Sequence, residues 1–271
     1  MPQGHLYALE RSTGAVRWKH PFPGGVGAQV LRWGETALAV TGSGEVAAVD
    51  VESGKIVWST SPSDEAGDRL LDPVLADGRL FVGWRPGSID AFDAATGRRL
   101  WRTRLPERLN TSLALSGAAV VAGTLGGGLY RLSREDGGIL KRLDLNGVAY
   151  GDLVEAGGCL LVLSAADPSS EDGPTQVTCF DPSLAKALWS FHSKGAISTF
   201  HPLVHQGRAV IGWKGALVAL DLGTGQEAWS CPLQGVPRGL GVSGEILYVG
   251  TLSGPVLALD PARCAPSPSP R

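Results

Sequence analysis

Methionine, charged residues and long apolar segments are all scarce in this chain, and each scarcity excludes a class of protein. Methionine occurs once, at position 1, and charged residues make up 18% of the 271 residues. The 24 basic and 26 acidic residues give a net charge of −2, so the composition carries no signature of binding to nucleic acid or to an anionic membrane. The uncharged run 113–130 holds five glycines and is too weakly apolar for a transmembrane segment.

Cysteine is also rare, and its spacing excludes the common zinc and redox motifs. No CxxC motif and no adjacent pair occurs among Cys159, Cys179, Cys231 and Cys264. A chain of this length buries a core without cross-links, so we expect unpaired thiols, although four cysteines would also allow two disulfides. The first residues, MPQGH, lack the basic start and apolar stretch of a signal peptide, so none is expected.

One segment recurs through the whole chain. It reads LYALERSTGAVRW at 6–18, VAAVDVESGKIVW at 46–58 and IDAFDAATGRRLW at 89–101. It returns as LYRLSREDGGILK at 129–141, VTCFDPSLAKALW at 177–189 and LVALDLGTGQEAW at 217–229, and a shortened copy, VLALDP, begins at 256. The last residues of the six longer copies are spaced by 40, 43, 40, 48 and 40 residues. A regular period of this length is typical of repeat architectures.

Each copy predicts two strands and a tight turn. Small and apolar residues alternate in 217–220, Asp221 can accept backbone N–H groups in the turn, and Gly225 permits a positive φ. Two more short strands precede each copy, as in 202–205 and 209–213. Four strands in about 40 residues leave no room for a helix, so each unit is a blade of an all-β propeller.

The pattern A-x-D-x-x-T-G-x-x-x-W resembles the tryptophan-docking motif of the PQQ-like (pyrroloquinoline-quinone-type) β-propeller repeat family. The resemblance covers nearly the whole chain and implies that the outer-strand tryptophan of each blade docks on a neighbouring blade. It assigns this structural role to Trp18, Trp58, Trp101, Trp189 and Trp229. Lys141 replaces the tryptophan in the fourth copy and Ala185 replaces the glycine in the fifth, so contacts there are expected to be weaker or repacked.

The repeat boundaries predict one β-propeller domain over 1–260 and a disordered, Pro- and Ser-rich tail over 261–271. Five of the seven units are complete, and the two terminal units are partial. The number of blades therefore stays open between six and seven, and the start within a repeat suggests a fragment of a longer protein.

Functional residues are sought where the repeat is broken, because the repeated Asp and Gly residues are scaffold. Polar residues at the start of inner strands predict a small-ligand site at the mouth of the central channel: Asp72, Asn110, Tyr150, Asp152, His201 and Arg238. His201 and His205 have the i, i+4 spacing of a helical metal pair, but they lie on a predicted strand, so no metal site and no catalytic residue is expected.

A second candidate site is a partner-binding face. Trp84-Arg85 and Trp213-Lys214 end the second strands of two blades, where other copies carry Thr or Ser. The acidic insertion 165–176 belongs to the same face. An exposed aromatic ring beside a cation is a common protein-binding pair, so these residues predict a protein or peptide partner.

The resemblance implies a non-catalytic binding module, similar to the scaffold propellers of outer-membrane protein assembly. A ligand-sensing domain of a larger protein, such as a Ser/Thr kinase, is the alternative. A PQQ-dependent dehydrogenase is a weaker alternative, because the adjacent cysteines and acidic metal site of such enzymes are not matched. We therefore expect no cofactor, with PQQ suggested by the resemblance alone. The compartment is the cytoplasm as the sequence is written, or the bacterial periplasm or cell envelope if the N-terminus is truncated or processed.

Overall fold

The computed structural model describes residues 3–61, 71–167, 173, 175–193, 197, 201–213, 215–252, 254 and 256–266. Among these residues the regular elements are strands, apart from a single-turn 3₁₀ helix, η1, at Pro261–Arg263. A search of the same residues for a helix of sufficient length and hydrophobicity to span a membrane finds none. The all-β class predicted from the repeats is confirmed.

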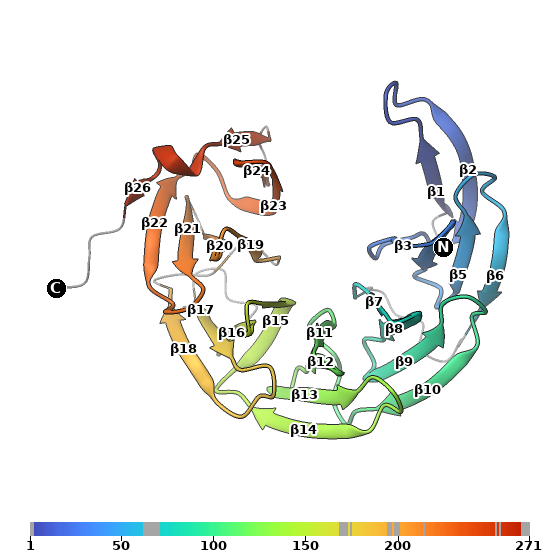
Figure 1. Ribbon diagram of the computed structural model, residues 1–271, viewed down its shortest axis with the longest axis horizontal. Coiled ribbons are helices and arrows are strands. Elements are labelled where there is room, and N and C mark those ends of the chain that lie inside the picture. The colour runs from blue at the N-terminus through green and yellow to red at the C-terminus, as the bar shows by residue number, and fades with distance from the viewer. Residues whose placement is uncertain are drawn as a thin grey trace. The chain divides into compact units, whose positions relative to one another are not determined.

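The strands form seven sheets (Figure 1). The first is a pair, β1 (Gln3–Leu9) and β2 (Val16–Pro23). Three four-stranded sheets follow: β3 (Leu31–Trp33), β4 (Thr36–Val40), β5 (Val46–Asp50) and β6 (Ile56–Thr60); β7 (Val74–Ala76), β8 (Arg79–Gly83), β9 (Ser88–Asp93) and β10 (Arg99–Arg104); β11 (Ala114–Ser116), β12 (Ala119–Gly123), β13 (Gly128–Ser133) and β14 (Ile139–Asp144).

The remaining sheets continue the same order. They are β15 (Val148–Ala156), β16 (Cys159–Ala165), β17 (Thr175–Phe180) and β18 (Ala187–His192); β19 (Leu203–His205), β20 (Arg208–Trp213), β21 (Ala216–Asp221) and β22 (Glu227–Pro232), with the short β26 (Ala265–Pro266) as a fifth strand; and β23 (Pro237–Ser243), β24 (Ile246–Thr251) and β25 (Leu257–Leu259). Five sheets thus carry all four strands of the repeat and two are partial, as the sequence predicts.

Burial along the strands follows from the position of each strand in its sheet. The third strand of a blade is covered on both faces, and five of the six residues of β9 are buried. Its sequence, SIDAFD, is accordingly small and apolar apart from Asp90 and Asp93. The outermost strand β18 instead alternates exposed with half-buried side chains.

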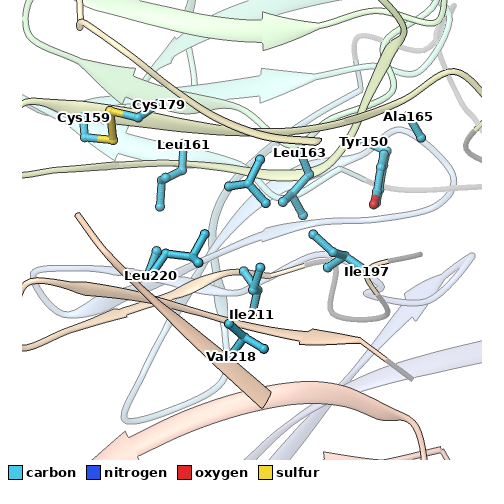
Figure 2. Close-up of a cluster of buried hydrophobic side chains, with 12 residues drawn as sticks. Tyr150, Cys159, Leu161, Leu163, Ala165, Cys179, Ile197, Ile211, Val218 and Leu220 are labelled. Carbon is cyan, nitrogen blue, oxygen red and sulfur yellow. A yellow bond between two sulfur atoms is a disulfide. The ribbon is translucent and has the colours of Figure 1, made fainter. Parts of the chain in front are cut away.

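The chain divides into two compact units, 1–120 with 132–140, and 121–131 with 141–271. The core of the first unit includes Leu38, Leu80, Val82 and Phe92, which pack as one buried cluster. In the second unit, side chains of β16 and β17 meet those of β20 and β21, with Leu161, Leu163, Ile211 and Val218 at the centre (Figure 2). The prediction of a single domain over 1–260 stays a prediction.

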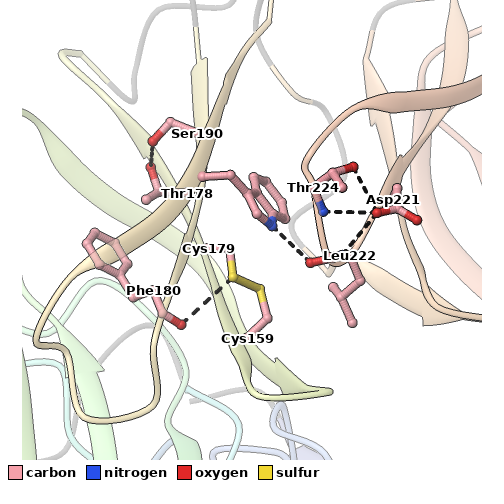
Figure 3. The surroundings of a disulfide bond; sticks show 10 residues. Cys159, Thr178, Cys179, Phe180, Ser190, Asp221, Leu222 and Thr224 are labelled. Carbon is pink, nitrogen blue, oxygen red and sulfur yellow. Dashed lines mark hydrogen bonds between the residues drawn. A yellow bond between two sulfur atoms is a disulfide. The ribbon is translucent and has the colours of Figure 1, made fainter.

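Two expectations about the covalent and terminal structure are wrong. The cysteines are paired: Cys159 is bonded to Cys179 between β16 and β17 (Figure 3), and Cys231 to Cys264. The predicted disordered tail is ordered over 261–266, because η1 begins there and β26 pairs with β22, with Ser230 opposite Ala265. Residues 267–271 lie outside the described residues.

Candidate functional site

The Asp-turn of each repeat is a hydrogen-bonded loop, as predicted. The Asp221 carboxylate accepts the backbone N–H and the hydroxyl of Thr224 at 2.9 and 2.8 Å (Figure 3), and Gly225 has a φ of 71°. The hydroxyl bond is the main cause that holds the pKa of Asp221 below its ordinary value. Equivalent hydroxyl bonds lower the pKa of Asp50, Asp93 and Asp181.

The outer-strand tryptophans reach the Asp-turn of the following sheet. The indole N–H donates to the backbone oxygen of the residue just after the Asp position: Trp18 to Val51 at 2.9 Å, Trp58 to Ala94 at 3.1 Å, Trp101 to Arg134 at 3.1 Å and Trp189 to Leu222 at 2.9 Å. Each ring lies on the turn glycine, so a β-carbon added to Gly225 would come within 2.5 Å of Trp189. We call each such contact a junction.

The fourth repeat builds its junction differently. Lys141 stands at the tryptophan position, and Ala185 stands at the position where the other turns carry glycine. The guanidinium of Arg131 donates to the oxygen of Pro182 at 3.2 Å, which is the acceptor that an indole would use. The contact around Lys141 and Ala185 is therefore repacked, as expected: Arg131 supplies the hydrogen-bond donor that an indole N–H supplies at the other junctions.

The junction of Trp229 differs from the other tryptophan junctions in another way. Its ring is buried, but no acceptor among the described residues lies within reach of its indole N–H. The turn position that is glycine elsewhere is Cys264, and its disulfide to Cys231 ties the turn to the strand that carries Trp229.

The predicted channel-mouth residues fall in both units. In the first, Asp72 accepts the Gln29 backbone N–H at 2.6 Å, and the Asp72 backbone N–H donates to the Ser112 hydroxyl at 3.1 Å. Asn110 is half-buried. These bonds tie Asp72 to the strand connections of its own unit.

In the second unit one pair of these residues meets. The His201 imidazole contacts the Asp152 carboxylate, and His201 is the more exposed partner. Arg238 is exposed. Tyr150 is 7% exposed and its hydroxyl donates to Thr175 at 2.9 Å, so burial raises its pKa. The expectation that Tyr150 faces a ligand is wrong, because its ring belongs to the core.

The prediction that Trp84 is an exposed anchor for a partner is also wrong. Its side chain is 2% exposed, and its indole N–H donates to the fully buried Asp90 carboxylate at 2.7 Å. Arg102 makes two bonds to the same carboxylate, each 2.8 Å long. Sequence reasoning missed this network, although the signal was a charged residue within the apolar third strand.

The other residues of the predicted partner face are partly accessible. Trp213 is half-buried and stacks on Phe191, with ring centroids 5.9 Å apart and planes 5° from parallel. Arg85 is half-buried, and its backbone oxygen accepts the Leu109 N–H at 3.0 Å. Lys214 and, within the insertion 165–176, residues 168–172 and 174 lie outside the described residues.

A cavity that the sequence did not predict lies in the first unit. The turns β7–β8, β11–β12 and β13–β14 border an open cavity of about 350 Å³, and Arg79 and Arg134 line it. These arginines are 55 residues apart in sequence: Arg79 begins β8, and Arg134 directly follows β13. No local sequence pattern joins the two.

Comparison with known proteins identifies the family. The family model of the outer membrane protein assembly factor BamB matches residues 2–84 and 85–242. The chain belongs to this family. BamB of Burkholderia pseudomallei is 36% identical over 178 residues, which cover 60% of this chain and 45% of that protein. BamB of Bordetella pertussis is 30% identical over 190 residues, covering 62% and 48%. The chain thus spans about half the length of these relatives.

Solved structures support the same fold. The crystal structure of BamB from Moraxella catarrhalis superposes with a TM-score of 0.73 at 22% identity, over 92% of this chain and 76% of that one. A polyvinylalcohol dehydrogenase from a Pseudomonas species is also similar, at 27% identity over 135 residues, which cover 37% of this chain and 20% of the enzyme. The β-propeller and PQQ-like repeat assignments are confirmed.

A quinone bound over Ca²⁺ would need six to eight oxygen ligands about 2.3–2.6 Å from the ion. In the second unit the Asp152 carboxylate meets the His201 imidazole, whose nitrogen is not among the ligands that calcium prefers.

Proposed function

We propose that this chain is a non-catalytic β-propeller module that serves as a protein-interaction scaffold in outer-membrane protein assembly. The observation that carries the proposal is the family match over both 2–84 and 85–242, within a fold of repeated four-stranded blades. Catalysis and a resident cofactor are not part of the proposal, because the relatives that match most of the chain are outer membrane protein assembly factors.

Within each unit, the partner surface that we propose is the end of the blades where the second strand turns into the third. Arg85 follows β8, and Trp213 ends β20 with its ring stacked on Phe191. A half-exposed aromatic pair offers a large contact area at a small cost in side-chain entropy. Lys214 and the insertion 165–176 are adjacent in sequence to this end and are included in the surface. Trp84 is excluded because it is buried.

The compartment that we propose is the bacterial periplasm or cell envelope. Both cysteine pairs are bonded, Cys159 with Cys179 and Cys231 with Cys264. Disulfides form and persist in oxidising compartments and are rare in a reducing cytoplasm. The pairing therefore favours the envelope over the cytoplasm.

The test is co-purification from a cell envelope fraction. The tagged chain, expressed in its host with oxidised disulfides, is expected to retain outer-membrane assembly proteins through a salt wash. A tagged Trp213→Ala, Arg85→Ala double variant with an unchanged melting temperature is the matched control and is expected to retain less.

Absence of assembly proteins from the wild-type sample would contradict the scaffold proposal. The same preparation is then assayed with PQQ, Ca²⁺ and polyvinyl alcohol in the presence of an artificial electron acceptor. Turnover above a heat-treated control would instead favour the dehydrogenase alternative.

A further inference from the structure

The cavity at the β7–β8 turn has a cationic interior and an acidic rim. The half-buried guanidinium groups of Arg79 and Arg134 line it, whereas the carboxylates at its edge, Asp77 and Glu135, belong to exposed residues. The accessible apolar wall comes from Ala76 and Ala118, because Phe81 beneath them is fully buried. At about 350 Å³ the space is within the range of small-ligand sites, roughly 300–1,000 Å³.

Both arginines are positioned by the junction of Trp101. The backbone oxygen of Arg134 accepts the Trp101 indole N–H at 3.1 Å and an N–H of Arg79 at 2.9 Å. Asp77, the residue of the β7–β8 turn with a φ of 49°, lies 3.2 Å from the Arg134 guanidinium. Since each guanidinium has five N–H donors, these bonds leave donors on both groups for a further acceptor.

The difference in exposure between the charges favours an anion. The Arg134 side chain is 24% exposed and Asp77 is 78% exposed. A solvated carboxylate can leave Arg134 for water at little cost, because exposed ion pairs contribute about 0–1 kcal/mol. A partly desolvated guanidinium gains more from a bidentate partner. A carboxylate is the planar anion that fits such a fork.

We propose that this cavity binds a carboxylate group through Arg79 and Arg134, with Asp77 displaced from Arg134, and that the carbon chain of the ligand lies against Ala76 and Ala118. The ligand is either an acidic side chain of a peptide segment or a free small dicarboxylate, which share this chemistry. The cavity is at the end of its blade opposite Arg85, so this site goes beyond the proposed scaffold surface.

The chain contains a matched control site. Arg208 occupies the position of Arg79 in the β19–β22 sheet, after a turn in which Gln206 also has a φ of 49°. There the residue equivalent to Arg134 is Pro261, and the cavity that Arg208 lines is about 10 Å³. That space is too small for a carboxylate with its carbon chain.

The experiment is a titration of the purified, disulfide-intact chain, followed by isothermal calorimetry and by the arginine Nε–Hε resonances in NMR. The probes are the capped peptide Ac-Gly-Glu-Gly-NH₂, its Gln counterpart and succinate. The Glu peptide or succinate is expected to bind and the Gln peptide is not. Arg134→Gln and Arg79→Gln are each expected to weaken binding about tenfold, the loss of one charge-assisted hydrogen bond. Arg208→Gln is expected to bind as the wild type does.

Binding of the Glu peptide alone assigns the site to a peptide side chain, and binding of succinate alone assigns it to a free dicarboxylate. The proposal is overturned if neither probe binds, if the Gln peptide binds equally well, if the Arg79 and Arg134 variants keep wild-type affinity, or if Arg208→Gln weakens binding as much as they do. Because no partner protein is present, these outcomes are independent of whether the scaffold proposal holds.

Discussion

Trp101 and Trp229 hold the same position in the repeat and both are buried, yet they differ in the hydrogen bond of the indole and in the cavity nearby. Trp101 donates to the oxygen of Arg134, whose side chain borders a cavity of about 350 Å³. Trp229 itself borders a cavity of about 10 Å³, and no acceptor among the described residues reaches its indole N–H. At Trp229 the turn is instead fixed by the Cys231–Cys264 disulfide and by β26 on the edge of β22.

This difference shows that the same repeat position is stabilised in two ways. An internal junction is stabilised by an indole on a glycine, and the turn residues beside it are free to form a cavity. The Trp229 junction lies beside the final, three-stranded sheet, and there a covalent bond and an added strand replace the indole hydrogen bond.

The largest expected effect is at the indole of an internal junction. Trp101→Ala removes a ring that is 9% exposed together with its bond to Arg134, and it is expected to lower the unfolding free energy by about 3–5 kcal/mol. Lys141→Ala empties no such pocket and is expected to cost much less. Denaturant midpoints of the two variants decide, and equal midpoints would remove the docking role proposed for the tryptophans.

The disulfide at the Trp229 junction is expected to have the next largest effect. Replacing both Cys231 and Cys264 by Ser is expected to lower the unfolding free energy by about 2–4 kcal/mol. It should also loosen η1, so that trypsin cleaves faster after the exposed Arg263. Unchanged stability and unchanged cleavage would mean that the terminal segment is held by strand pairing alone.

The turn glycine is expected to matter only beneath a tryptophan. Gly137 has a φ of 75°, and a β-carbon there would lie 2.6 Å from the Trp101 ring. Gly137→Ala is therefore expected to cost more than the roughly 1–2 kcal/mol of the left-handed conformation. In the turn without tryptophan the positive φ, 59°, lies at Leu184 and not at Ala185, so Ala185→Gly is expected to cost only the added chain entropy, about 1 kcal/mol or less. Thermal unfolding of both variants tests this, and equal losses would contradict it.

The pH dependence of the Asp-turns is expected to be the smallest effect. The pKa of Asp221 is lowered in the folded chain by the Thr224 hydroxyl, so the unfolded chain binds more protons at acid pH. Its contribution to stability is complete above the ordinary carboxyl pKa and is lost as the pH falls through the lowered folded value. Asp221→Asn should therefore differ from wild type more at pH 7 than at pH 3. An undiminished difference at pH 3 would contradict the assigned cause.

The periodic part of the structure could be predicted from the sequence, and the convergent part could not. The strands around Asp221 and the turn at Gly225 follow from the alternation of apolar residues and from turn-forming residues, and this pattern recurs in the repeat copies. Trp84 was misjudged because its burial depends on the carboxylate of Asp90 and on Arg102, which lies on another strand.

The candidate sites show the same limit. Arg79 and Arg134 meet only because two turns of adjacent sheets come together, and no local pattern records that meeting. Cys264 belongs to the last, incomplete repeat copy and stands where most copies have the turn glycine. Its bond to Cys231 could be anticipated only after this last turn had been aligned with the others.

Contact between the proposed partner surface and an outer-membrane assembly protein can be tested by photo-crosslinking in living cells. A photoreactive residue is placed at Arg85 and, for comparison, at Ala95, which is exposed at the opposite end of the same sheet. We expect a crosslink to an assembly protein from position 85 and none from position 95. Crosslinks from neither position, or from position 95 alone, would contradict this expectation.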